Sequence, residues 1–129
     1  MELSGTDQDA PAEPAAAGKV CTRPIDLVYL ARFTLGNRAL EREVLELFAE
    51  QAPLYLGQMR TAADDKGWHM AAHTLKGSAR AVGAWKVAEA AEVAESCKSA
   101  DAVSRGAAMK RIEPLIVETR SYIADLFKD

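Results

Sequence analysis

The sequence predicts an all-α fold, specifically an antiparallel up-down four-helix bundle with a short additional N-terminal helix. Apolar residues recur at three- and four-residue intervals over four long segments, which is the period of a helix with one buried face. No segment alternates with a period of two for long, so no sheet is expected. Short turns join the four segments, which favours antiparallel neighbours.

Size and composition are those of one globular domain. The chain has 129 residues, 49% of them hydrophobic and 27% charged, which is enough for one core. A net charge of −3 and only 6% aromatic residues argue against a nucleic-acid-binding surface. No apolar run has the length that spans a bilayer, and the N-terminus lacks the layout of a signal peptide. We therefore expect a cytoplasmic protein without membrane contact.

We divide the chain into a tail, residues 1–22, and a helical domain, residues 23–129. The tail is rich in Ala, Pro, Asp and Glu and has no hydrophobic period, so we expect it to be disordered. Cys21 and Cys97 match no zinc or CxxC spacing. We interpret both as free thiols in a reducing compartment.

Two helices are predicted before residue 63. Pro24 opens the first and Gly36 ends it. Its apolar face consists of Ile25, Val28, Tyr29, Arg32 and Phe33. The second spans roughly residues 38–62, with Asn37 as its N-cap. Its wide apolar stripe combines two rows, Leu40, Val44, Leu47, Gln51 and Leu54, and Leu45, Phe48, Ala52, Tyr55 and Met59. Pro53 should kink this helix rather than end it, because the pattern resumes.

Three further helices follow. A turn at residues 64–67 supplies an N-cap for the third, Trp68 to Val82, and Gly83 is its natural end. The fourth, Trp85 to Ser99, turns Val87, Ala90, Ala91, Ala94 and Cys97 inward.

After a turn at residues 99–101, the last helix covers about 102–127. Its apolar seam is Ile112, Leu115, Ile116, Thr119, Ile123 and Leu126. Pro114 should bend this helix or split it in two.

The third helix has two different faces. At 100° per residue, Ala71, Leu75, Ser78 and Val82 fall on a small or apolar arc that indicates core. The opposite arc carries His69, His73, Lys76, Gly77, Arg80 and Ala84. A glycine inside a helix costs about 0.5–1 kcal/mol relative to alanine. Gly77 therefore needs another reason, and the simplest is bare space beside His73 where another molecule can approach.

His73 has the chemistry and the surroundings for phosphoryl transfer. An exposed imidazole offers a neutral, nucleophilic nitrogen near pH 7. Lys76 lies one turn further, where its charge can stabilise phosphoryl oxygens. A lone histidine is most often a plain surface residue, but the exposed arc, Lys76 and Gly77 together favour function. Because a Gly-rich phosphate loop is missing, we expect no autonomous kinase activity.

The run Ala72-His73-Thr74-Leu75-Lys76-Gly77-Ser78, followed by Val82-Gly83-Ala84, resembles the signature of histidine-containing phosphotransfer (HPt) domains. The resemblance covers residues 24–127. It implies that His73 accepts a phosphoryl group on a ring nitrogen from the aspartyl phosphate of a receiver domain and passes it to a second receiver. Lys76 and Gly77 occupy the family's lysine and glycine positions, and Ser78 is the small residue packed beneath.

Members of that family often place a polar side chain of the following helix against the imidazole. Glu95 is our candidate, although glutamine is common there and glutamate departs from it. A carboxylate on the non-reacting nitrogen would fix the tautomer and raise the basicity of the ring. A solvated Glu95 on an exposed helix edge is an equal alternative.

We assign His69, Arg80 and Ala84, which share the arc of His73, to partner binding. Arg80 would add positive charge toward an acidic receiver, or would be merely solvated. The second helix should extend this surface, with Leu56 as a docking candidate. His69 and His73 have the spacing of a two-histidine metal site but no third ligand, so no metal is expected.

The resemblance implies a phosphohistidine carrier in the phosphorelay of a bacterial two-component system, not an autonomous kinase. Its partners would be response-regulator receiver domains or a hybrid sensor histidine kinase. No cofactor is expected, because the catalytic magnesium belongs to the receiver. We expect a monomer, since the bundle can close its own core. One alternative is a non-catalytic four-helix-bundle adaptor that binds a receiver or kinase domain. Another is an enzyme with a histidine base, which lacks a second catalytic group.

Overall fold

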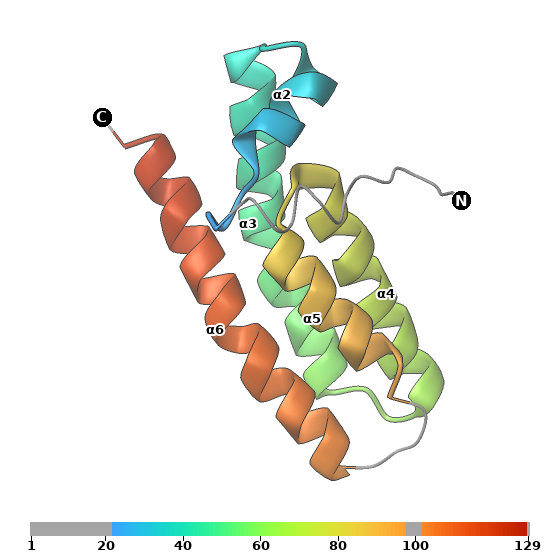
Figure 1. Cartoon of the computed structure of the whole chain (residues 1–129). Helices are drawn as coiled ribbons and strands as arrows, with labels where there is room; N and C mark the ends of the chain where they lie inside the picture. The colour runs from blue at the N-terminus through green and yellow to red at the C-terminus, as the bar shows by residue number, and fades with distance from the viewer. Residues whose placement is uncertain (1–21, 98–101, 129) are drawn as a thin grey trace, which may run out of the picture.

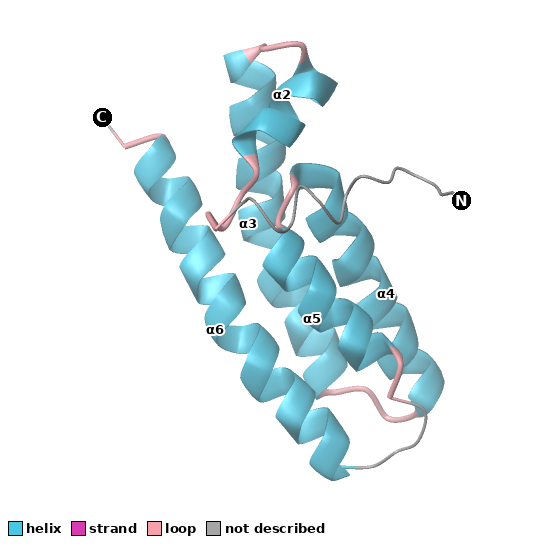
Figure 2. Ribbon diagram, viewed as in Figure 1, coloured by secondary structure: helices cyan, strands magenta, loops and turns pink. Residues whose placement is uncertain are grey.

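The computed structural model of this chain describes residues 22–97 and 102–128. Within these ranges every regular element is a helix, as Figure 2 shows, and this confirms the all-α prediction. The helices are α2 (Leu27–Thr34), α3 (Arg38–Arg60), α4 (Asp65–Val82), α5 (Trp85–Glu95) and α6 (Ala102–Leu126). The predicted tail, apart from residue 22, and the turn at residues 99–101 lie outside the described residues.

The four longer helices lie side by side and run alternately up and down (Figure 1). α4 packs against α3 and α5, and α6 packs against the same two helices. The core between them is a single cluster of buried apolar side chains. Among the helices described, none combines the length and apolarity that crossing a bilayer requires.

α2 begins later than predicted, because Asp26 rather than Pro24 starts it. The Asp26 carboxylate caps the helix by accepting the N–H of Tyr29, and it also accepts the indole N–H of Trp85 at 2.9 Å. The Asp26 N–H donates to the carbonyl of Gly83. These bonds tie α2 to the connection between α4 and α5.

The predicted apolar face of α2 is only partly buried. Ile25 is fully buried, and the ring of Tyr29 packs edge-on against Trp85. Val28 and Phe33, by contrast, are 70% and 64% exposed. Part of the predicted apolar face of α2 therefore lies outside the core.

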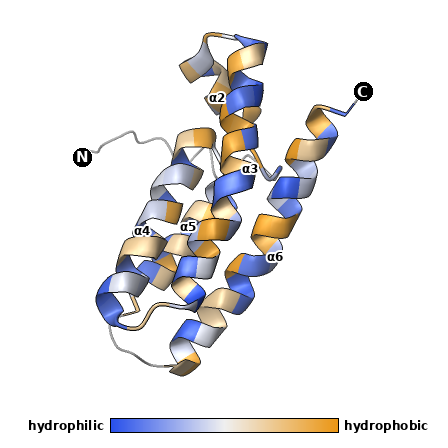
Figure 3. Ribbon diagram, turned by 180° about the vertical axis from the view of Figure 1, so that it is seen from behind, coloured by the Kyte–Doolittle hydropathy of each residue, from blue (hydrophilic) through white to orange (hydrophobic). Residues whose placement is uncertain are grey.

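Only one of the two predicted rows of α3 belongs to the core. Leu45, Phe48, Ala52 and Met59 are buried, whereas Leu40, Leu47 and Leu54 are exposed. Leu56, our docking candidate, is 7% exposed and lies in the core, so that prediction was wrong. The reason is the placement of neighbours: α4 and α6 pack against α3, and Leu40, Leu47 and Leu54 lie on the side of α3 that they leave open. Seen from behind, hydrophobic residues recur along the outer side of α3 (Figure 3). The helix runs through Pro53 as predicted.

α4 begins three residues earlier than predicted, because Asp64 caps it by accepting the N–H of Gly67 at 2.8 Å. Gly83 ends it in the left-handed conformation with φ 79°, as predicted.

α5 is shorter than predicted and ends at Glu95. Its predicted inward residues Val87, Ala90, Ala91 and Ala94 are buried. Cys97 lies beyond the helix and is a half-buried free thiol.

α6 is one helix that contains Pro114, so the proline does not split it. Its seam is confirmed at Ile112, Ile116, Thr119 and Ile123, while Leu115 and Leu126 pack at its margin.

Candidate functional site

The face of α4 opposite the core carries most of the predicted site residues. His69, His73, Gly77 and Arg80 are exposed, and Ala71, Leu75 and Val82 on the other face are buried. Ser78 is half-buried. Four of the residues predicted to form one chemical face therefore do share it.

Ala84 does not belong to this face. It is fully buried, so its assignment to partner binding was wrong. The left-handed Gly83 ends the helix, and the chain then turns so that the N–H of Ala84 donates to the carbonyl of Ala79 at 2.8 Å. The helical projection that placed Ala84 beside His73 does not hold beyond Gly83.

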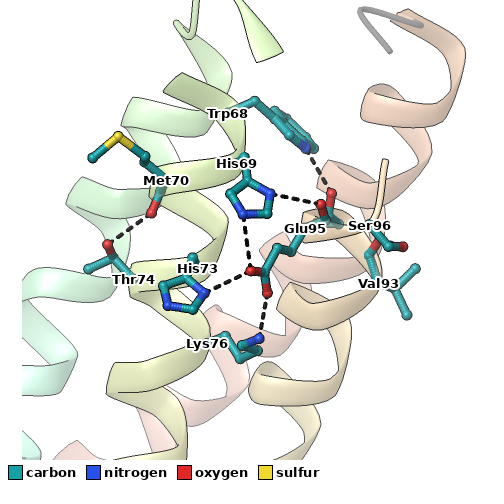
Figure 4. Close-up of polar contacts among 10 residues, drawn as sticks. Trp68, His69, Met70, His73, Thr74, Lys76, Val93, Glu95 and Ser96 are labelled. Atoms are coloured by element: carbon teal, nitrogen blue, oxygen red, sulfur yellow. Dashed lines mark hydrogen bonds and ion pairs between the residues drawn. The ribbon is translucent and has the colours of Figure 1, made fainter. Parts of the chain in front are cut away.

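Glu95 is the centre of the site. It is the last residue of α5, its side chain is 13% exposed, and it points toward α4 (Figure 4). Its Oε2 lies 2.7 Å from Nδ1 of His73, and its Oε1 lies 2.6 Å from Nζ of Lys76. The expected contact between Glu95 and His73 is therefore present, and the solvated alternative does not describe this residue.

The bond to Glu95 determines which ring nitrogen of His73 carries the hydrogen. A carboxylate can only accept, so the Nδ1 of His73 must carry the hydrogen that joins them. In the neutral ring, the lone pair then belongs to Nε2. The side chain of His73 is 64% exposed. In the neutral form of the ring, the arrangement makes Nε2 the nucleophilic nitrogen.

The charge of Glu95 is stabilised by its partners. The hydrogen bond from Lys76 is the largest cause that lowers the pKa of Glu95 below its ordinary 4.5. Burial acts in the opposite direction, and the bond from His73 adds to the lowering. Glu95 therefore stays ionised at neutral pH, as an acceptor for Nδ1–H must.

This lowered pKa predicts a contribution to acid stability. A carboxyl whose pKa is lower in the folded state stabilises that state above its ordinary pKa and loses the effect as pH falls through the lowered value. As pH falls below 4.5, the wild-type free energy of unfolding should therefore decrease more steeply than that of Glu95→Gln. Urea unfolding at a series of pH values measures this. Glu92→Gln is the matched control, because Glu92 is a 57% exposed partner of Arg80 on the same helix. Equal slopes for wild type and Glu95→Gln would contradict the assignment.

Lys76 faces Glu95 rather than open solvent. Its side chain is 15% exposed and its Nζ is engaged with Oε1. Its ammonium would have to leave Oε1 to reach a group bound at His73. Arg80 forms a more exposed pair with Glu92 at 3.5 Å.

The space that we expected at Gly77 is present. A Cβ added at this position would meet no atom within 4 Å outside the local helix backbone. No contact among the described residues therefore requires a glycine here, and the surface next to His73 is open.

Sequence reasoning did not identify the support beneath the site. The indole of Trp68, which is 1% exposed, donates to the carbonyl of Ala94 at 2.8 Å and joins α4 to the end of α5. The guanidinium of Arg105 lies 5.0 Å from the centre of the indole ring and pairs with Asp65. The available signal was a tryptophan on the core arc directly before His69.

A groove of about 890 Å³ lies between α3 and α6, and it is lined by residues such as Glu46, Arg120 and Phe127. None of the site residues lines it. Within residues 22–97 and 102–128, no group of three His, Cys, Asp or Glu side chains is arranged to hold a metal ion.

Comparison with known proteins identifies a family. The family model described as Hpt domain matches residues 43–126. This stretch contains α4, α5 and α6 with every residue of the site, and it excludes α2. No match is found among the curated proteins or among the solved structures.

Proposed function

This chain belongs to the Hpt domain family, and from that premise we propose that it carries a phosphoryl group as N-phosphohistidine at His73 between receiver domains of a phosphorelay. The observation that supports this most is the bond from His73 Nδ1 to Glu95, which leaves Nε2 as the nucleophile. The family supplies the reaction class, and the geometry of α4 and α5 supplies the roles of the residues. In this proposal, α3 to α6 form the antiparallel four-helix bundle of the domain.

In the first step, the lone pair of Nε2 forms a bond to the phosphorus of an aspartyl phosphate on the donor. The bond between phosphorus and the aspartate oxygen breaks, and its electron pair restores the donor carboxylate. The ring of His73 keeps its Nδ1–H and gains positive charge, which Glu95 stabilises at 2.7 Å. In the second step, an aspartate carboxylate of the acceptor attacks the phosphorus, the P–N bond breaks, and neutral His73 returns.

Lys76 has its first role before the reaction. By pairing with Oε1 at 2.6 Å, it keeps Glu95 charged and turned toward His73. Stabilisation of the phosphoryl oxygens by Lys76 is a second proposed role, which requires Nζ to move from Oε1 to the incoming group. The catalytic magnesium is proposed to lie in the receiver, so the chain needs no cofactor of its own.

The partner surface is proposed to combine α4 around Gly77 with the adjoining flank of α3. Arg42 and Glu46 line the groove beside α6, so they mark the α6 side of α3. Leu47 and Leu54 lie two turns apart on the face of α3 away from its buried row and are 50% and 61% exposed. Receiver domains, free or within a hybrid sensor kinase, are the proposed partners. A monomeric state and a cytoplasmic location stay predictions.

Replacing Leu54 with glutamate is expected to weaken receiver binding about tenfold, because a charge replaces an apolar contact in the proposed surface. Transfer at limiting receiver concentration should fall by a similar factor, and transfer at saturation should fall much less. Titration of the receiver measures both. Val117→Glu on α6 is the control, since Val117 is similarly exposed and lies on another helix. Equal losses in both variants would exclude this flank as a docking surface.

The test of the proposed function is transfer itself. The protein is mixed with a panel of phosphorylated receiver domains, its intact mass is followed, and the adduct is tested in acid and in base. An adduct that maps to His73, is lost in acid and persists in base is the expected result. Binding of receivers without any adduct would favour the non-catalytic adaptor. If no receiver of the panel binds and none yields an adduct, the proposal is contradicted.

A further inference from the structure

A second imidazole lies beside the reacting one. The rings of His69 and His73 are 6.2 Å apart between centres and nearly parallel, at 11°. His69 contacts Glu95 with both nitrogens: Nδ1 lies 3.3 Å from the main-chain carbonyl oxygen, and Nε2 lies 3.4 Å from Oε2. Oε2 of Glu95 is therefore shared by the two imidazoles (Figure 4).

Both oxygens that contact His69 are hydrogen-bond acceptors. A carbonyl and a carboxylate only accept, and a neutral imidazole has one N–H, so neutral His69 can satisfy one of its two contacts. Protonated His69 carries an N–H at each of the two nitrogens that contact Glu95. His73 differs, because one nitrogen faces Glu95 and the other must keep its lone pair for the reaction.

We infer that His69 is a positioning residue for phosphoryl transfer: its protonated ring, held between two oxygens of Glu95, opposes a second proton on His73 and keeps Nε2 free at lower pH. This inference rests on the proposed function of His73. Two unit charges at this separation in watery surroundings change proton affinity about two- to threefold. The phosphorylated ring is not penalised in the same way, because the arriving phosphoryl group brings negative charge.

The other charged groups around the pair keep their charge while imidazole titrates. Imidazole is the side chain whose ordinary titration falls between pH 5 and 8. Glu95 contacts both rings and pairs with Lys76. The other charged pairs formed by α4 with α5 and α6 are Arg80 with Glu92 and Arg105 with Asp65. The change in local charge near neutral pH therefore comes from the two histidines.

The first test needs no partner. The ring signals of His73 are followed by NMR from about pH 5 to 9 in wild type and in His69→Gln, whose amide cannot become charged. The pH midpoint of the His73 ring signals should rise in His69→Gln. The rise should correspond to a two- to threefold gain in the proton affinity of His73. His69→Lys, which carries a constant charge, should bring the midpoint back toward wild type. Lys66→Gln removes a charge from the same helix and should leave the midpoint in place.

An unchanged His73 midpoint in His69→Gln would overturn the inference. So would equal midpoints in His69→Gln and His69→Lys, because the two variants differ in charge at the same position. Circular dichroism and thermal unfolding of each variant show that the compared proteins are folded.

The second test measures the rate of phosphoryl transfer from one phosphorylated receiver. At every pH the rate of each variant is divided by the wild-type rate, so that the pH dependence of the receiver itself cancels. The ratio for His69→Gln should fall between about pH 8.5 and pH 6, by at most about two- to threefold. A ratio that is constant with pH would assign His69 to docking or structure and overturn the inference. If wild type accepts no phosphoryl group, the proposed function fails, and the NMR titration still decides the role of His69.

Discussion

Replacing His73 with glutamine is expected to abolish phosphoryl acceptance and to leave the fold and partner binding intact. The amide nitrogen has no lone pair available for attack on phosphorus, so the loss should be at least about a thousandfold. The side chain of His73 is 64% exposed, so its replacement leaves no cavity in the core. The free energy of unfolding should change by less than about 0.5 kcal/mol. Intact mass after incubation with a phosphorylated receiver measures the first effect, and urea unfolding measures the second.

The control for His73→Gln is the same substitution one turn away. His69→Gln keeps the nucleophile and should still form the adduct, although with the altered pH dependence described above. Receiver binding by His73→Gln, measured by calorimetry, separates docking from chemistry. Persistent transfer in His73→Gln would show that another residue accepts the phosphoryl group. Loss of binding together with transfer would show that the imidazole itself is a main contact with the partner.

Replacing Gly77 with leucine should make the protein more stable and less active. Leucine has a higher helix propensity than glycine, and no atom lies within 4 Å of a Cβ at this position, so the free energy of unfolding should rise by about 0.5–1 kcal/mol. The same side chain fills the surface over which a receiver must approach His73. Transfer should therefore fall at least about a hundredfold, because a small displacement of the reacting atoms is costly.

Gly106→Leu on α6 separates the two effects. Gly106 also has open space around its Cβ position, but it lies on a helix outside the proposed docking surface. This variant should gain similar stability and transfer normally. A Gly77→Leu protein that accepts phosphoryl groups at the wild-type rate would exclude close approach of the partner over Gly77. In that case the adaptor alternative would also lose its most direct docking site.

The two predictions separate the parts of the proposed function. His73→Gln removes the nucleophile and keeps the surface, whereas Gly77→Leu keeps the nucleophile and changes the surface. An adaptor that only binds receivers would be insensitive to the first change and sensitive to the second. A phosphotransfer protein is sensitive to both.

The sequence by itself determined the features that depend on neighbours along one helix. The period of apolar residues placed Leu75 and Val82 on the buried face of α4 and His73 on the exposed one. Gly83 ended this helix as its chemistry predicts, since glycine adopts a positive φ at little cost. These features follow from a repeat of 3.6 residues per turn and from local hydrogen bonds at helix ends. Both depend only on residues that are close together in the sequence.

The tertiary structure decided which helix faces are covered and which side chains meet across helices. Leu56 is buried and Leu54 is exposed because α4 and α6 cover one side of α3, and the apolar pattern of α3 fits either choice. Ala84 is buried and does not lie on the predicted surface, because the chain changes direction at Gly83.

The shared carboxylate is the clearest case of what only packing decides. Glu95 lies 22 residues from His73 in sequence and 2.7 Å from it in space. The family resemblance suggested this contact, but it did not indicate that Lys76 and His69 would bind the same side chain. Such contacts depend on the separation and rotation of α4 against α5, which are set by the packing of their buried faces and not by the period of either helix.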